Sequence, residues 1–266
     1  MPSHQPPAGR KPAHKPDIAE DLARAIFAGE HAPGGFLPRE LDLCARYGVS
    51  RSTVRSALQQ LVSAGMLTRI SGQGSRVREL SDWHLLDPRV SDWMARFAQP
   101  NPRIQRDIFA FRVAVEPFMA RLAAAHATAA DLLAIETAWQ SMIRALEAPD
   151  RRCEGRSHDE HDVAFHEAIF AATHNLLWAQ LSHMLKPAIG LLVETSNHSA
   201  DELSDSMERH RRLMEAIRLR QPDEAEQAAL SVLERTGLDL GFESLFDHPP
   251  PRLRLRLPGA DVPEPG

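Results

Sequence analysis

An acidic and an imidazole side chain lie one helical turn apart in the second half of the chain. Asp162 and His166 form an Asp-x-x-x-His pair in a helical segment, so both project from the same face. Such a pair is often only a surface hydrogen bond, but it also suits Zn²⁺, Ni²⁺ or Mn²⁺. His210, within MERHRRLMEAI, is the best-placed third ligand from another helix. We therefore predict a divalent-metal site at Asp162, His166 and His210, with zinc as the expected ion.

Histidines are dense around this pair, since seven of the thirteen lie between His158 and His210. His158 and His161 flank a predicted capping box that runs from Ser157 to Glu160. We expect these two side chains to face solvent rather than the metal.

A charged side chain also interrupts an apolar helical run. Arg112 lies within IFAFRVAV, where a buried guanidinium needs an anionic partner. Glu116, one turn later, offers an internal salt bridge. Alternatively, Arg112 pairs with the carboxylate of a small ligand while the metal takes other ligand oxygens. Asn175 either contacts that ligand or caps a helix. The candidate ligand-binding residues are therefore Arg112, Glu116 and Asn175.

Guanidinium and hydroxyl groups gather at the start of a helix predicted after Ser50. Arg51 and Arg55 are four residues apart and share one face of that helix. A first turn that carries Arg, Ser and Thr suits the major groove of DNA, because Arg can form two hydrogen bonds to guanine. A solvated cationic face is the alternative, and Arg39 and Arg69 are placed for phosphate contacts. The candidate DNA-binding residues are Arg39, Ser50, Arg51, Ser52, Thr53, Arg55 and Arg69.

The elements that position these arginines form a small module. Helical periodicity predicts three short helices over residues 18–65. Residues 67–70 and 75–77 flank a Gly-Gln-Gly turn and predict a β-hairpin. Three helices followed by a hairpin predict a winged helix-turn-helix over residues 17–78.

The rest of the chain is predicted to be α-helical, so the fold class is mainly α. A linker and a linking helix over residues 79–100 lead to an all-α antiparallel bundle over residues 101–245. No strand pattern is found after residue 82. Pro117 and Pro187 are each expected to kink or break a helix.

The two modules differ in charge. The formal net charge is -5, but the residues through Arg78 hold eleven basic and six acidic side chains, a net of +5, which leaves -10 for the remainder. Such a break is expected where one module meets a polyanion and the other does not, although chance segregation also produces it.

Composition excludes several classes of protein. Two cysteines far apart exclude a disulfide framework or a Cys-based zinc ribbon. The first residues of the sequence show no apolar signal-sequence pattern and no stretch is apolar enough to span a bilayer, so we expect a cytoplasmic protein with no membrane partner. The proline-rich ends, residues 1–16 and 246–266, are predicted to be disordered tails.

The first module resembles the DNA-binding domain of the GntR family of bacterial transcription regulators, over the run PGGFLPRELDLCARYGVSRSTVRSALQQLVSAGMLTRISGQGSRV. The resemblance implies DNA contacts by Arg51, Thr53, Arg55 and Gly72. Many relatives carry Glu-Arg where this chain has Glu40-Leu41, so that basic contact is missing here, and we expect Arg39 to substitute for it.

The second module resembles the effector-binding FCD domain of the FadR subfamily, a helical bundle with a metal near its centre. The matching segments are FRVAVEPFMARLAA, DVAFHEAIFAATHN and ERHRRLMEAI. They place Asp162, His166 and His210 on three of the metal-ligand positions. The fourth position is a histidine in the last helix, where this chain has AEQAALSVLERTG. The resemblance thus implies a metal that is weakly bound, completed by water or effector, or absent.

The segments WHLLDPRVSDWM, VEPFMARLAAAHAT, HEAIFAATHN and DEAEQAAL also resemble repressors of galactonate and related sugar-acid operons. This implies a nucleoid-associated homodimer that binds a palindromic operator and is released by a galactonate-like hexonate. One alternative is an activator in another carboxylic-acid pathway, and another is an architectural DNA-binding protein without an effector. A metal-dependent hydrolase is disfavoured, because the second histidine of a His-Glu-x-x-His motif is missing after His166.

Overall fold

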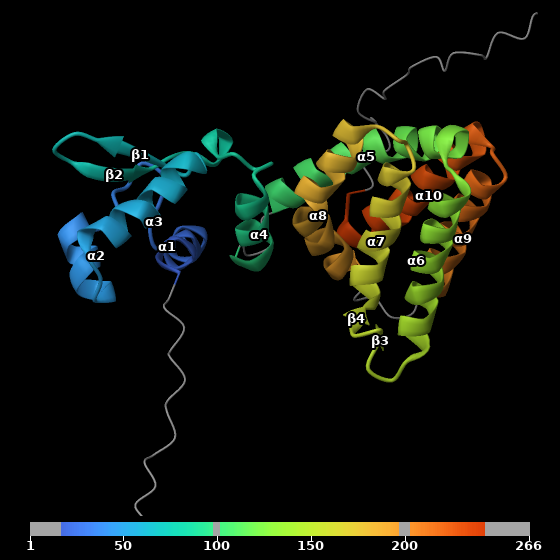
Figure 1. Cartoon of the computed structure of the whole chain (residues 1–266), viewed down its shortest axis with the longest axis horizontal. Coiled ribbons are helices and arrows are strands. Elements are labelled where there is room, and N and C mark those ends of the chain that lie inside the picture. Colours follow the sequence, from blue (N-terminus) through green and yellow to red (C-terminus); the bar gives the residue numbers. More distant parts are fainter. Residues whose placement is uncertain (1–16, 98–101, 197–202, 243–266) are drawn as a thin grey trace, which may run out of the picture. The chain divides into compact units, whose positions relative to one another are not determined.

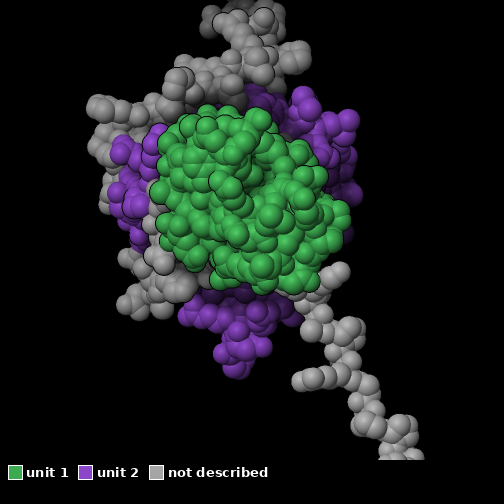
Figure 2. Space-filling model, turned by 90° about the vertical axis from the view of Figure 1, so that its left-hand side faces the viewer, with its two compact units in different colours: residues 1–84 green, residues 85–266 purple. Residues whose placement is uncertain are grey.

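The chain divides into two units, residues 1–84 and 85–266, which are coloured separately in Figure 2 and described here one at a time. The computed structural model describes residues 17–97, 102–196 and 203–242. Both tails predicted from the sequence, residues 1–16 and 246–266, lie outside the described residues.

The first unit confirms the predicted winged helix-turn-helix. Its elements are α1 (Ile18–Phe27), α2 (Glu40–Tyr47), α3 (Arg51–Ser63), β1 (Leu67–Ile70) and β2 (Gly74–Val77) (Figure 1). Ser50 caps α3 as expected, because its hydroxyl accepts the backbone N–H of Thr53. The two strands pair antiparallel, from Leu67 opposite Val77 to Ile70 opposite Gly74, and form the wing.

The segment after the wing folds back onto the end of α3. The backbone N–H of His84 donates to the carbonyl of Ala64, just before Gly65. Gly65 has a φ of +74°, and a Cβ built there would lie 2.6 Å from the carbonyl oxygen of Asp82. Both the left-handed backbone and this close approach require glycine.

The second unit is an all-α bundle, as predicted. Its helices are α4 (Pro88–Phe97), α5 (Pro102–His126), α6 (Ala129–Glu147), α7 (His158–Ala171), α8 (Leu176–Ser196), α9 (Leu203–Arg218) and α10 (Pro222–Leu240) (Figure 1). Helix α10 packs along α5 and α9, α7 packs between α6 and α8, and α4 packs on α8. One large apolar cluster joins α5, α6, α7, α9 and α10, so the helices that carry the candidate ligands share one core.

Two details differ from the sequence prediction. Pro117 and Pro187, each expected to kink or break a helix, lie inside α5 and α8, so neither proline breaks its helix. The bundle also contains a short antiparallel ladder, β3 (Arg152–Cys153) with β4 (Arg156–Ser157), which the helical pattern did not predict. Each strand has only two residues, too few for an alternating pattern to be visible in the sequence.

None of the helices within the described residues has the length and the apolar character of a membrane span.

Candidate functional site

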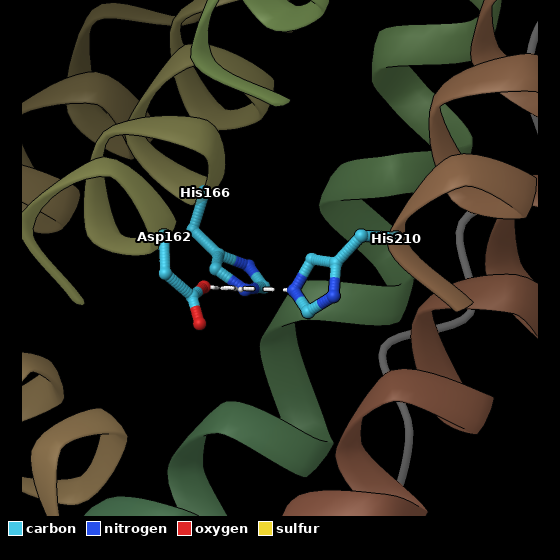
Figure 3. Close-up of side chains that lie close together, drawn as sticks. All are labelled: Asp162, His166 and His210. Carbon is cyan, nitrogen blue, oxygen red and sulfur yellow. Dashed lines mark ion pairs between the residues drawn. The ribbon is translucent and has the colours of Figure 1, made fainter. Parts of the chain in front are cut away.

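The three predicted metal ligands meet in the core of the second unit. Asp162 and His166 project from successive turns of α7, and His210 approaches from α9, so that the three side chains point toward one another (Figure 3). All three are buried, and one ligand atom from each lies within 4.8 Å of the others. The structure thus brings together the residues that the sequence pattern selected.

The atoms that converge are lone-pair donors. Nε2 of His166 lies 3.3 Å from Oδ1 of Asp162, and Nε2 of His210 lies 3.5 Å from the same oxygen. Oδ1 of Asp162 and Nε2 of His210 have no hydrogen-bond partner among the described residues. Buried polar atoms are rarely left unpaired, so these orphaned atoms fit a cation better than an apolar core.

The opposite nitrogen of each imidazole has its own partner. Nδ1 of His210 lies 2.7 Å from the backbone carbonyl of Ser206, to which it can only donate. Nδ1 of His166 lies 3.1 Å from Oε2 of Glu116. A histidine that donates through Nδ1 presents the lone pair of Nε2, and metal-binding histidines are commonly oriented in this way.

Arg112 and Glu116 form a buried ion pair beside this cluster. Nε of Arg112 lies 2.6 Å from Oε1 of Glu116, and the two side chains are 1% and 5% exposed. The internal salt bridge considered from the sequence is therefore present. Nη2 of Arg112 also lies 3.5 Å from Nε2 of His166, and Nη1 has no hydrogen-bond partner among the described residues. The guanidinium thus touches His166 through Nη2 and keeps Nη1 unpaired among the described residues.

The charges of the cluster stabilise one another. Burial alone would raise the pKa of Asp162, but His210 and His166 hold that pKa well below its ordinary value. Burial would lower the pKa of His166, whereas Glu116 and Asp162 raise it to about 9. Burial likewise opposes ionisation of Glu116, yet Arg112 and His166 lower its pKa to about 2. Arg112 and His166 thus stabilise the ionised forms of Glu116 and Asp162.

A cavity beside the cluster is very small. It measures about 10 Å³ and is lined by Glu116, Ala120, His166, Ile169, Phe170, Leu213 and Ala229. A cavity of that size holds about one water molecule, whereas small-molecule pockets measure about 300–1,000 Å³. The cavity that the structure shows is therefore too small for an organic acid.

Three other predicted positions lie away from the cluster. The expectation that His158 and His161 face solvent was wrong, since they are 5% and 4% exposed. Each ring lies against a backbone carbonyl, that of Met142 in α6 for His158 and that of Cys153 in β3 for His161. Asn175 is exposed and caps α8 by accepting the N–H groups of Leu177 and Trp178. The cap alone accounts for its position.

The candidate DNA-binding residues gather around the start of α3. Arg51, Arg55 and Arg69 have side chains 61%, 58% and 39% exposed. Ser50, Ser52 and Thr53 are exposed and linked through their hydroxyls. The other two predicted contacts are Arg39, exposed before α2, and Gly72, which has a φ of +73° at the tip of the wing.

Sequence reasoning missed one residue of this surface. Glu40 accepts hydrogen bonds from Arg55 and Arg69 and lies at its centre. The sequence signal was an acidic residue directly after Arg39, a predicted DNA contact.

Comparison with known proteins assigns the chain to a family. The pattern described as "Bacterial regulatory proteins, gntR family" matches residues 15–77, and "FCD domain" matches residues 107–235. The galactonate operon transcriptional repressor of Escherichia coli K12 is 31% identical over 218 residues, which cover 81% of this chain and 92% of that repressor. The chain belongs to the GntR family.

Other GntR relatives agree with this assignment. The Glc operon transcriptional activator of Escherichia coli K12 is 30% identical over 218 residues, covering 80% of this chain and 83% of the activator. The solved structure of Lar from Listeria monocytogenes is 15% identical, with a TM-score of 0.57 over 87% of this chain and 99% of that one, and is similar in fold. The chain is therefore a ligand-responsive, DNA-binding transcription regulator of the GntR family and not an enzyme.

Proposed function

We propose that the chain is a homodimeric repressor of a sugar-acid catabolic operon, located in the cytoplasm at the nucleoid. Its effector is a galactonate-like hexonate, which releases it from a palindromic operator. The observation that supports this most is the buried guanidinium of Arg112, which contacts His166 and whose Nη1 has no hydrogen-bond partner among the described residues. The likeness to the galactonate operon repressor supports the choice of acid.

The three ligands fit a divalent cation, and zinc suits one carboxylate with two imidazoles. A cation held there supplies positive charge and open coordination positions for ligand oxygens. Asp162, His166 and His210 hold it, Glu116 orients His166, and the backbone of Ser206 orients His210. Helix α10 offers no histidine, so the protein supplies three ligands.

The charge balance favours an anionic effector. In the metal-free cluster, the proton on His166 completes a neutral set with Arg112, Glu116 and Asp162. If a divalent cation replaces that proton, Arg112 and the cation carry three positive charges against two carboxylates. The single excess charge suits the monoanion of a sugar acid, and Arg112 offers it a guanidinium fork.

The effector needs an open form of the bundle, because the present cavity accommodates about one water molecule. An acid that binds only the open form shifts the population of the two forms. Asn175 remains a proposed effector contact only if that opening brings the start of α8 to the site.

On the first unit, we assign the DNA contacts to the exposed groups around α3 and the wing. The basic side chains are Arg39, Arg51, Arg55 and Arg69, and the others are Ser50, Ser52, Thr53 and Gly72. Two such units in a dimer meet two operator half-sites.

A thermal-shift panel tests this function. Zinc-loaded protein is heated with hexonates, hexuronates, hexarates and small hydroxy acids, each with and without chelator. Stabilisation by a hexonate that disappears with chelator supports the proposal. Stabilisation by a different acid would contradict the proposed hexonate effector. Stabilisation that persists with chelator would show that the acid binds without a metal.

A further inference from the structure

One carboxylate joins three guanidinium groups on the surface of the winged helix. Oε2 of Glu40 lies 2.9 Å from Nε of Arg55, and Oε1 lies 3.0 Å from Nη1 of Arg69. Nη2 of Arg51 lies 3.9 Å from Oε2. Glu40 belongs to α2, Arg51 and Arg55 to α3, and Arg69 to β1, so one side chain connects all the elements that carry the arginines.

The contacts fix the direction of Arg55. The Nε–H of Arg55 donates to Glu40, so the N–H groups on its two Nη atoms can donate to another acceptor. Two hydrogen bonds from such a pair of donors are the commonest way that arginine recognises guanine. Arg69 is held twice, by Glu40 and by the backbone carbonyl of Arg55, 3.4 Å from its Nη2.

Two simpler roles, stabilisation of the α2 helix dipole and general surface charge, explain the position of Glu40 less well. An acidic residue in the first turn of α2 suits the helix dipole, but Asp42 of the same turn also does this and accepts the backbone N–H of Arg39. A carboxylate on a surface that meets phosphates also weakens the electrostatic attraction to DNA. The side chain of Glu40 is 22% exposed. Hydrogen bonds from Arg55 and Arg69 lower the pKa of its carboxyl group, although burial acts in the opposite direction.

We infer that Glu40 is a positioning residue for sequence-specific DNA recognition, which orients Arg55 and Arg69 before DNA binds. The inference rests on the proposed DNA contacts of these arginines. An unrestrained arginine binds any nearby phosphate, whereas an oriented one presents its donors in a single direction. Glu40 therefore lowers affinity for random DNA and raises affinity for the operator.

The test compares two duplexes and two charge-matched variants. A duplex enriched from a random-sequence pool by the wild-type protein serves as the specific probe, and a scrambled duplex of the same composition as the non-specific one. Glu40→Gln and Asp42→Asn each remove one negative charge from the first turn of α2. Only the first removes the carboxylate shared by the arginines.

Glu40→Gln is expected to lower the ratio of specific to non-specific affinity by about five- to tenfold. It should also steepen the salt dependence of non-specific binding by about one unit. Asp42→Asn should leave the ratio unchanged. An unchanged ratio in Glu40→Gln, or an equal rise in both affinities, overturns the inference, because Glu40 would then act by charge alone.

A second readout requires no DNA. The Nε–H signal of Arg55 in an NMR spectrum should exchange slowly with water in the wild-type protein and rapidly in Glu40→Ala. Equal exchange in the two proteins also overturns the inference. If the wild-type protein enriches no sequence from the pool, the proposed DNA contacts themselves are contradicted. This outcome differs from the two that overturn the role of Glu40.

Discussion

Nδ1 of His166 lies 3.1 Å from Oε2 of Glu116, while Nε2 of the same ring lies 3.3 Å from Oδ1 of Asp162. The same Glu116 carboxylate binds Arg112 through its other oxygen. One carboxylate thus links the proposed metal ligand to the proposed effector-binding cation. Two ligands that share such a link change each other's affinity by the same factor.

The first prediction concerns this link. Glu116→Gln should weaken zinc binding by about 10- to 100-fold. Arg112 can only donate and retains the single amide oxygen, so the Nδ1–H of His166 faces an NH2 group in place of an acceptor. Competition with a chromophoric chelator measures the affinity. Glu167→Gln serves as the control, since Glu167 pairs with His183 and Lys186 at the surface. Equal zinc affinity in the Glu116 variant and wild-type protein would show that the contact does not orient the ligand.

The second prediction concerns the buried ion pair. Arg112→Met should lower the free energy of unfolding by about 3–5 kcal/mol, because Glu116 is left as a buried charge beside one fewer cation. Adding Glu116→Leu should restore part of that loss, since two apolar residues of similar size tolerate burial. Urea unfolding of both variants gives the comparison. If the single variant is as stable as wild-type protein, the two charges are not coupled.

The ligand cluster illustrates what the sequence could predict. The spacing of Asp162 and His166 placed both on one face of a helix, and the structure brings them to His210. Glu116 was predicted as a partner of Arg112, but its contact with His166 was not. That contact joins α5 to α7, and helical periodicity carries no information about which residues meet across two helices.

The errors have a similar origin. His158 and His161 were expected to be exposed because they flank a helix cap, yet His158 lies against α6 and His161 against β3. Pro117 was expected to kink or break its helix, and α5 is not broken there. Local rules predicted the elements well, whereas burial at their ends depends on the neighbours they meet.

The third prediction tests the turn after α3. Gly65→Ala should destabilise the first unit by more than the roughly 1–2 kcal/mol expected from its left-handed backbone, because the new methyl group meets the carbonyl of Asp82. Gly29→Ala is the matched control, with a φ of +79° and open space around the glycine. Hydrogen exchange of peptides from α3 measures the stability. Equal losses in the two variants would contradict the proposed contact.

The fourth prediction concerns pH. The hydroxyl of Tyr47 donates to Asp21 and is the largest cause that lowers the pKa of this carboxyl group. Because that pKa is lower in the folded than in the unfolded state, the stabilisation is present above about pH 3.9 and is lost as pH falls through the folded value. Tyr47→Phe should therefore raise the pKa of Asp21 toward about 3.9. NMR titration of the Asp21 carboxyl carbon measures it, and an unchanged pKa would exclude the hydroxyl as its cause.

The most direct test of a metal-dependent, acid-responsive regulator is the dissociation constant of the zinc-loaded protein for its enriched duplex, measured with and without galactonate and related hexonates. We predict that one hexonate raises this constant by about tenfold, and that chelator or Asp162→Asn abolishes the change. His183→Ala, which removes an exposed histidine outside the cluster, should respond as wild-type protein does. A constant that no hexonate alters in the zinc-loaded wild-type protein would contradict the proposed function.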